Sequence, residues 1–273
     1  MNTQRNEVRS NDGMRVPVWT SGRGRPLLIV HGTAGTHDTW EMMRAHLDDH
    51  FTVSIMDRRA TSGDPLSALE MNREFEDVAA VARSLDGDVA VLGHSSGALC
   101  ALGAAPLIPN LRHLLLYEPP LNQGDHYLVA LQKMQQLLKE GDIDAVYDAW
   151  LKDYLRLPDA LVDQIKASPI GASMRPLAQY LPRQMAALLA WTLDPSAFNN
   201  VSARTVYLVG SETPIKLRGF IKLLEQALPN FTVREIPGQG HFANFFAPEL
   251  LAEIIVDSIQ RACDQQFGSS SDT

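Results

Sequence analysis

The chain has 273 residues, 45% of them hydrophobic and 21% charged, which is enough for one large core and indicates one α/β domain with an insertion. Its formal net charge is −8 and its pI is about 5.5, and no long basic run occurs, which argues against a nucleic-acid-binding groove. No apolar stretch approaches the ~20 residues that a membrane-spanning helix needs.

The first half of the chain alternates strands with helices. Two strands over 7–22 are expected to form a hairpin, because Asp12-Gly13 between them is a strong turn signal. Continuous apolar strands separated by helices indicate a parallel sheet that is covered on both faces. The predicted strands are 26–32, 51–59, 88–95 and 111–120, and the predicted helices are 36–50, 74–87 and 96–105.

The alternation stops over 121–199, where apolar spacing predicts helices and no convincing strand. The strand pattern returns in 203–214 and 231–242, each followed by a predicted helix. We therefore expect a core built from 1–120 and 200–265, with 121–199 inserted as a helical cap. The polar residues 266–273 are expected to form a disordered tail.

A serine motif lies where a strand passes into a helix. The pentapeptide "GHSSG", residues 93–97, fits Gly-x-Ser-x-Gly with Ser95 at its centre. Its glycines permit a sharp turn, and a helix that begins behind Ser95 favours negative charge developing there. Such pentapeptides also occur by chance, but the strand before and the helix after predict a nucleophile elbow.

A serine hydroxyl needs a base, and His241 is the best candidate among the eight histidines. It follows the last predicted strand, where Gly238 and Gly240 make a loop that can bring an imidazole back over the sheet. His94, which precedes Ser95, is expected to pack beneath the elbow rather than to act as the base.

A tetrahedral oxyanion needs two preorganised donors. The first would be the backbone N–H of Ser96, directly after the expected nucleophile. The second should come from "HGTAG", residues 31–35, where Thr33 is the favoured donor and Ala34 the alternative. Small residues there let the backbone approach closely, although an ordinary strand-to-helix turn would have the same composition.

Together, "HGTAG", "MDRRATSGD", "GHSSG" and "GQGHF" resemble the α/β-hydrolase superfamily over about 15–265. The resemblance implies the α/β-hydrolase fold: a mostly parallel eight-stranded sheet flanked by helices, with a helical lid and a Ser–acid–His triad. Superfamily members usually show Asp-x-Arg-Gly after the fourth strand, whereas here Ala60 follows Arg58 and Arg59. Asp57 in that segment is expected to be a turn and packing residue.

The expected acid also departs from the superfamily pattern. The usual Asp position, in the loop after the strand that follows the cap, holds Thr213, and Glu212 is its neighbour. Some members, including a group of haloalkane dehalogenases, instead carry a Glu at the end of the strand after the nucleophile helix, which here is Glu118. Burying a carboxylate is costly unless it is paired, so we favour Glu118, with Glu212 as the alternative and a solvated role open to either.

Ser95 is incompatible with a dehalogenase, because those enzymes use an Asp nucleophile. A serine with a histidine and a carboxylate favours an acyl-enzyme route to hydrolysis of a carboxylic ester, thioester or lactone. Bulky cap side chains could line a pocket for a small hydrophobic substrate, although each could equally fasten the cap to the core. These candidates are Trp150, Tyr154, Met174, Tyr180, Met185 and Trp191.

Two other functions share the layout. Carbon–carbon bond hydrolases and cofactor-free haloperoxidases have the same arrangement, whereas a non-catalytic small-molecule binder would be expected to lose Ser95 or His241. We expect no cofactor, metal, nucleic acid or membrane partner, and a monomer or homodimer. Two cysteines and no apolar N-terminal segment favour a reducing, cytoplasmic location.

Overall fold

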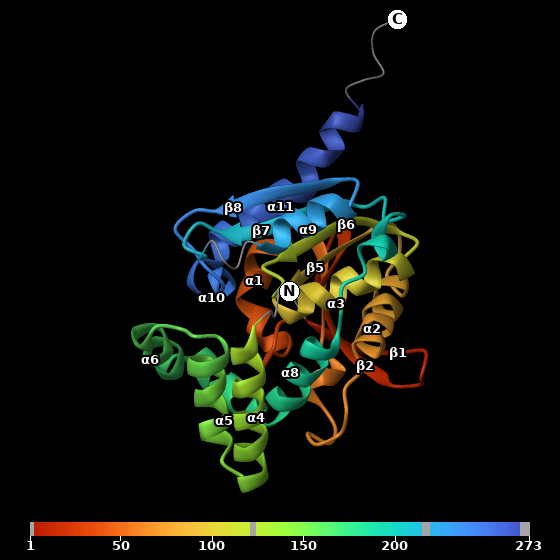
Figure 1. The fold of residues 1–273 in the computed structure, drawn as a ribbon. Helices are drawn as coiled ribbons and strands as arrows, with labels where there is room; N and C mark the ends of the chain where they lie inside the picture. The colour runs from red at the N-terminus through yellow and green to blue at the C-terminus, as the bar shows by residue number, and fades with distance from the viewer. Residues whose placement is uncertain (1–2, 121–123, 215–218, 268–273) are drawn as a thin grey trace, which may run out of the picture.

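The computed structural model describes residues 3–120, 124–214 and 219–267, and its centre is an eight-stranded sheet (Figure 1). The strand order is β1-β2-β4-β3-β5-β6-β7-β8. β2 pairs antiparallel with β1 and with β4, and all other pairs are parallel, so the expected mostly parallel eight-stranded sheet is confirmed. The strands are Gln4–Arg9 (β1), Arg15–Gly22 (β2), Arg25–Val30 (β3), Phe51–Met56 (β4), Val89–His94 (β5), Leu111–Tyr117 (β6), Arg204–Gly210 (β7) and Phe231–Ile236 (β8).

Helices cover both faces of this sheet, as the continuous apolar strands predict. All six residues of β5 are buried, since side chains on either face meet a helical layer. One face packs against α1 (Glu41–Leu47) and α11 (Pro248–Phe267), and the other packs against α2 (Met71–Arg83), α3 (Ser96–Ala104) and α9 (Gly219–Ala227). Four short elements complete the helical layers: η1 (His37–Trp40), η2 (Arg59–Thr61), η3 (Ala105–Leu107) and α10 (Ala243–Phe246).

Between β6 and β7 the described residues form helices and turns, and in Figure 1 most of these helices, coloured green to teal, lie together at one end of the molecule. They are α4 (Asp125–Glu140), α5 (Ile143–Ala149), the π-helix η4 (Trp150–Tyr154), α6 (Asp159–Ala167), α7 (Pro169–Met174), η5 (Arg175–Tyr180), α8 (Leu181–Ala190) and η6 (Pro195–Phe198). We call this segment the cap. The first three residues of its predicted span, 121–123, lie outside the described residues.

One arginine fastens the cap to the core. The Arg183 guanidinium on α8 donates hydrogen bonds to the backbone carbonyls of Arg59, Ala60, Ser62 and Asp64 and to the hydroxyl of Ser67. One planar group therefore satisfies several carbonyls of the loop that follows β4, which fixes the position of α8 above it.

The end of the chain differs from its prediction. α11 continues to Phe267, so the first two residues of the predicted disordered tail belong to a helix, and 268–273 lie outside the described residues. Across the parts of the chain that are described, no helix is both long enough and apolar enough to cross a membrane.

Candidate active site

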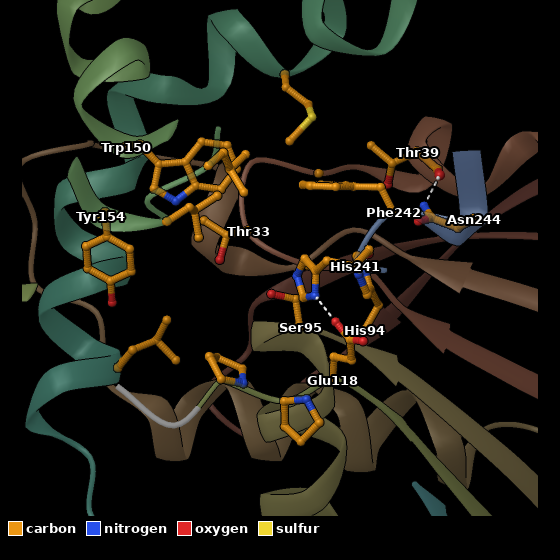
Figure 2. Close-up of a pocket in the computed structure, with 18 of the residues that line it drawn as sticks. Thr33, Thr39, His94, Ser95, Glu118, Trp150, Tyr154, His241, Phe242 and Asn244 are labelled. Carbon is orange, nitrogen blue, oxygen red and sulfur yellow. Dashed lines mark hydrogen bonds and ion pairs between the residues drawn. The ribbon is translucent and has the colours of Figure 1, made fainter. Parts of the chain in front are cut away.

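A cavity lies between the carboxyl ends of the parallel strands and the cap, and it brings Ser95, Glu118 and His241 together (Figure 2). Ser95 follows β5, Glu118 follows the neighbouring strand β6, and His241 comes from the loop after β8. Parallel strands end at the same edge of a sheet, which explains how residues 95, 118 and 241 meet.

Ser95 has the strained backbone of a nucleophile elbow, with φ 54° and ψ −125°. Its N–H donates to the carbonyl of Tyr117 at 2.8 Å, which extends the pairing of β5 with β6 by one residue. Glycines permit the turn: a Cβ on Gly93 would lie 2.4 Å from the carbonyl oxygen of Gly97, and one on Gly97 would lie 2.3 Å from that of Val30. The motif glycines are therefore required by close backbone approach.

Glu118 is the carboxylate that contacts the candidate base. Its Oε2 lies 2.7 Å from Nδ1 of His241, while its Oε1 accepts hydrogen bonds from the N–H of Gly210 at 2.8 Å and from the hydroxyl of Thr213. Thr213, which holds the usual acid position of the superfamily, thus supports the acid instead of replacing it. Glu212 is exposed and does not line the cavity.

The surroundings keep Glu118 ionised. Burial raises the pKa of this carboxyl, but its hydrogen bond with His241 and the charge there, together with the donors Thr213 and Gly210, outweigh burial and leave the pKa below its usual value. Glu118 also has a positive φ of 44°, which is rare for a residue with a side chain and marks a strained position.

Two aromatic side chains hold the His241 loop. His94 Nε2 lies 2.9 Å from the backbone carbonyl of His241, so this nitrogen carries the hydrogen and donates it. Burial, followed by the charge of His241, holds the pKa of His94 well below its ordinary value, so the ring stays neutral. The Tyr117 hydroxyl donates to the carbonyl of Gly240 and accepts from the N–H of Ala243 at 3.0 Å.

Figure 2 shows the imidazole of His241 beside Ser95, with its hydrogen bond running on to Glu118. The sequence predicted that His94 would pack near the elbow, but the role of Tyr117 was missed. Its position, immediately before Glu118 at a strand end, was the available signal.

The two residues that are expected to supply the oxyanion donors lie close together, because the Thr33 hydroxyl donates to the Ser96 hydroxyl at 2.9 Å. Thr33 lines the cavity, whereas Ala34 is buried and does not line it. Ser96 begins α3, so its N–H is one of the helix-start groups that lack an acceptor within the helix. A Cβ on Gly32 would lie 3.1 Å from the Cβ of Ser95, which shows how closely the "HGTAG" loop approaches the elbow.

Four of the six predicted pocket residues line the cavity: Trp150, Tyr154, Met174 and Met185. Tyr180 and Trp191 do not. Tyr180 packs under the Arg183 guanidinium, 5.3 Å from ring to charge, and Trp191 packs edge-on against Phe75 at 5.8 Å. Trp191 therefore fastens the cap to the core, which was the alternative that the sequence left open, whereas Tyr180 contacts a cap side chain that itself binds the core.

Further apolar side chains that the sequence did not single out complete the lining, and they are Tyr127, Leu155, Leu157, Leu188, Phe242 and Phe245. Phe242 directly follows the candidate base, and Leu155 and Leu157 lie just after the predicted pocket residue Tyr154. Proximity to residues already chosen was therefore the only signal for them.

The comparisons with known proteins agree with this architecture. A family model described as "Alpha/beta hydrolase family" matches residues 27–254. The chain belongs to that family. The expected superfamily, and with it the expected enzyme class of hydrolase, is therefore confirmed.

Solved structures resemble this α/β hydrolase over most of its length. An alpha/beta hydrolase from Sphaerobacter thermophilus is 28% identical, with a TM-score of 0.79, and the match covers 93% of this chain and 99% of that one. A hydrolase from Pseudomonas aeruginosa is 18% identical, with a TM-score of 0.77 and coverage of 94% and 98%. A thermophilic esterase from Thermogutta terrifontis is 17% identical, with a TM-score of 0.70 and coverage of 96% and 98%.

Proposed function

We propose that this hydrolase cleaves a carboxylic ester, thioester or lactone of a small hydrophobic substrate through an acyl-enzyme on Ser95. The observation that carries the proposal is the 2.7 Å contact between His241 Nδ1 and Glu118 in a cavity that Ser95 also lines. A carboxylate on that nitrogen orients the ring and favours the tautomer whose other nitrogen can accept a proton from a serine.

In the proposed reaction, His241 Nε2 takes the proton of the Ser95 hydroxyl as Oγ bonds to the substrate carbonyl carbon. The carbonyl oxygen becomes an oxyanion that accepts hydrogen bonds from the N–H groups of Thr33 and Ser96. When the intermediate collapses, the bond to the leaving alcohol or thiol breaks and His241 returns the proton to that group. Water repeats the sequence on the acyl-enzyme and releases the acid, while Glu118 stays ionised throughout.

The lining of the cavity supports an apolar substrate. Trp150, Met174 and Met185 line it from the cap, and among the described residues that line it there is no Lys or Arg and the only carboxylate is Glu118, which is engaged with His241. A charged acyl chain would lose its hydration there without a partner. The similar fold of the Thermogutta esterase is consistent with this class of reaction.

A substrate panel with a nucleophile variant tests the proposal. Wild type and Ser95→Ala should be assayed with p-nitrophenyl esters of increasing chain length, with lactones and with 1,3-diketones. We expect ester or lactone turnover by wild type, and a loss of several orders of magnitude in Ser95→Ala, with ~10³-fold residual catalysis over water. Turnover of diketones alone would favour carbon–carbon bond hydrolysis, and full activity of Ser95→Ala would disprove the proposal.

A further inference from the structure

A buried ion pair lies beside the elbow. Arg58 follows β4, and its Nε donates to Oε2 of Glu74 at 2.6 Å, with both side chains at most 2% exposed. Glu74 also accepts from the N–H of Ala60 and the thiol of Cys100. A buried ion pair adds little to stability compared with apolar residues of similar size, so its position invites a functional explanation.

Arg58 contacts both segments that carry the proposed oxyanion donors. On the elbow side, its Nη1 donates to the hydroxyl of Ser96 at 2.8 Å. On the loop side, the same nitrogen lies 3.3 Å from the backbone carbonyl of His31, and the Arg58 backbone N–H donates to His31 Nε2 at 3.1 Å.

These contacts define which ring nitrogen of His31 carries the hydrogen. Because a backbone N–H can only donate, Nε2 accepts, and Nδ1 carries the hydrogen that it donates to the carbonyl of Gly32 at 2.9 Å. Burial, followed by the charge of Arg58, lowers the pKa of His31 to about 4, so the ring is neutral at pH 7. The His31 ring therefore bonds to the backbone of Gly32, immediately before Thr33, and the ring itself is bonded to the backbone of Arg58.

The Ser96 hydroxyl joins the two segments directly. It accepts from Arg58 and also from the Thr33 hydroxyl at 2.9 Å, and Ser96 is fully buried. Thr33 and Ser96 are the residues whose N–H groups are expected to face the oxyanion. The side chains of these two residues bond to each other, so the two expected backbone donors are tied together.

We propose that the Ser96 hydroxyl, held by Arg58 and Thr33, is a positioning group that sets the spacing of the two oxyanion donors. The inference rests on the proposed function, since it assumes that an oxyanion forms. A shift of the order of 1 Å in such donors costs up to ~10²-fold in rate. The hydroxyl acts before substrate arrives, so its loss should weaken binding of the transition state more than binding of the substrate.

The test is a double-mutant cycle with Ser96→Ala and Thr33→Val, neither of which removes a backbone N–H. Each should lower kcat for a p-nitrophenyl ester ~10–100-fold with little change in KM, and should raise the inhibition constant of phenylboronic acid by a similar factor. Because the Thr33 hydroxyl acts through the Ser96 hydroxyl, Thr33→Val should add no further loss in Ser96→Ala, and the double variant should lose no more than Ser96→Ala alone. Arg58 itself is left intact, since its removal would strand a buried Glu74 carboxylate.

Cys100→Ala is the matched control, because this thiol donates to Glu74 and interacts with Arg58 in the same network, but among the described residues its side chain makes no hydrogen bond with Thr33, Ser96 or His31. Its kcat and boronate inhibition constant should stay within about twofold of wild type, whatever happens to its urea midpoint. Unchanged kcat in folded Ser96→Ala, fully additive losses, or an equal loss in Cys100→Ala would overturn the positioning role. If wild type itself hydrolyses no ester and Ser95 takes no fluorophosphonate, the proposed function fails, and the inference falls with it.

Discussion

The two sides of the cavity are built from different chemistry. On the sheet side, polar groups hold one another: Glu118 bonds to His241, Gly210 and Thr213, and His94 bonds to the His241 loop. On the cap side, the lining is mostly apolar, and within the described residues the Tyr154 hydroxyl is buried with no hydrogen-bond partner. This difference underlies our proposal that the sheet edge sets the reaction geometry and that the cap selects the substrate.

The largest expected effect lies on the sheet side. Glu118→Gln keeps the shape of the side chain but removes the charge that His241 contacts, so kcat should fall by up to ~10⁴-fold. Glu212→Gln is the matched control, because this exposed carboxylate lies outside the cavity, and it should change kcat little. The reverse pattern in two folded variants would place the acid in the loop after β7.

Removing the hydroxyl that donates a hydrogen bond to Glu118 should lower kcat by a smaller factor than removing the carboxylate. Thr213→Val preserves shape but removes the hydroxyl that donates to Glu118, and a hydrogen bond to a charged group contributes ~1.5–3 kcal/mol. We expect a ~10–100-fold loss in kcat, which steady-state kinetics would measure. Thr205→Val, a buried change in β7 away from the cavity, is the control. Equal losses in both variants would make the effect one of general packing.

Substitutions of cap residues that line the cavity should change the substrate preference of the enzyme. Met185→Ala enlarges the apolar lining, and the ratio of kcat/KM between long and short acyl esters should shift by ~1–3 kcal/mol for each methylene-sized change in fit. Leu128→Ala, on an exposed position of α4, is the control and should leave the ratio unchanged. If lining variants change only the unfolding midpoint, the cap contributes stability and not selection.

The smallest effect concerns acid stability. The folded-state pKa of Glu118 lies below its ordinary value of 4.5, so its ionised form stabilises the fold above about pH 4.5, and this contribution is lost as pH falls through the folded pKa. The difference in unfolding free energy between wild type and Glu118→Gln should therefore shrink below that pH, by at most ~1.4 kcal/mol per pH unit. Urea unfolding at several pH values measures it, and a gap that widens in acid would contradict the assignment.

Much of the fold can be predicted from the local pattern of apolar residues. Apolar residues are continuous in a strand that is buried on both faces, whereas in a helix they recur every three or four positions. Strand ends also predict which loops meet, which is why Ser95, Glu118 and His241 could be chosen from the sequence. The direction of a bulky side chain in the cap does not follow from the sequence, so the prediction groups Tyr180 and Trp191 with Trp150. The same limit hid the contact of Arg58 with Ser96, since no periodicity links residues 38 positions apart.

We propose that Ser95 is a nucleophile that His241 and Glu118 activate. The most direct measurement is the rate at which a fluorophosphonate labels Ser95, located by peptide mass spectrometry, in wild type, Glu118→Gln and Glu212→Gln. We expect a single label on Ser95, formed at similar rates in wild type and Glu212→Gln and far more slowly in Glu118→Gln. A label on another residue, or slow labelling only in Glu212→Gln, would contradict the account.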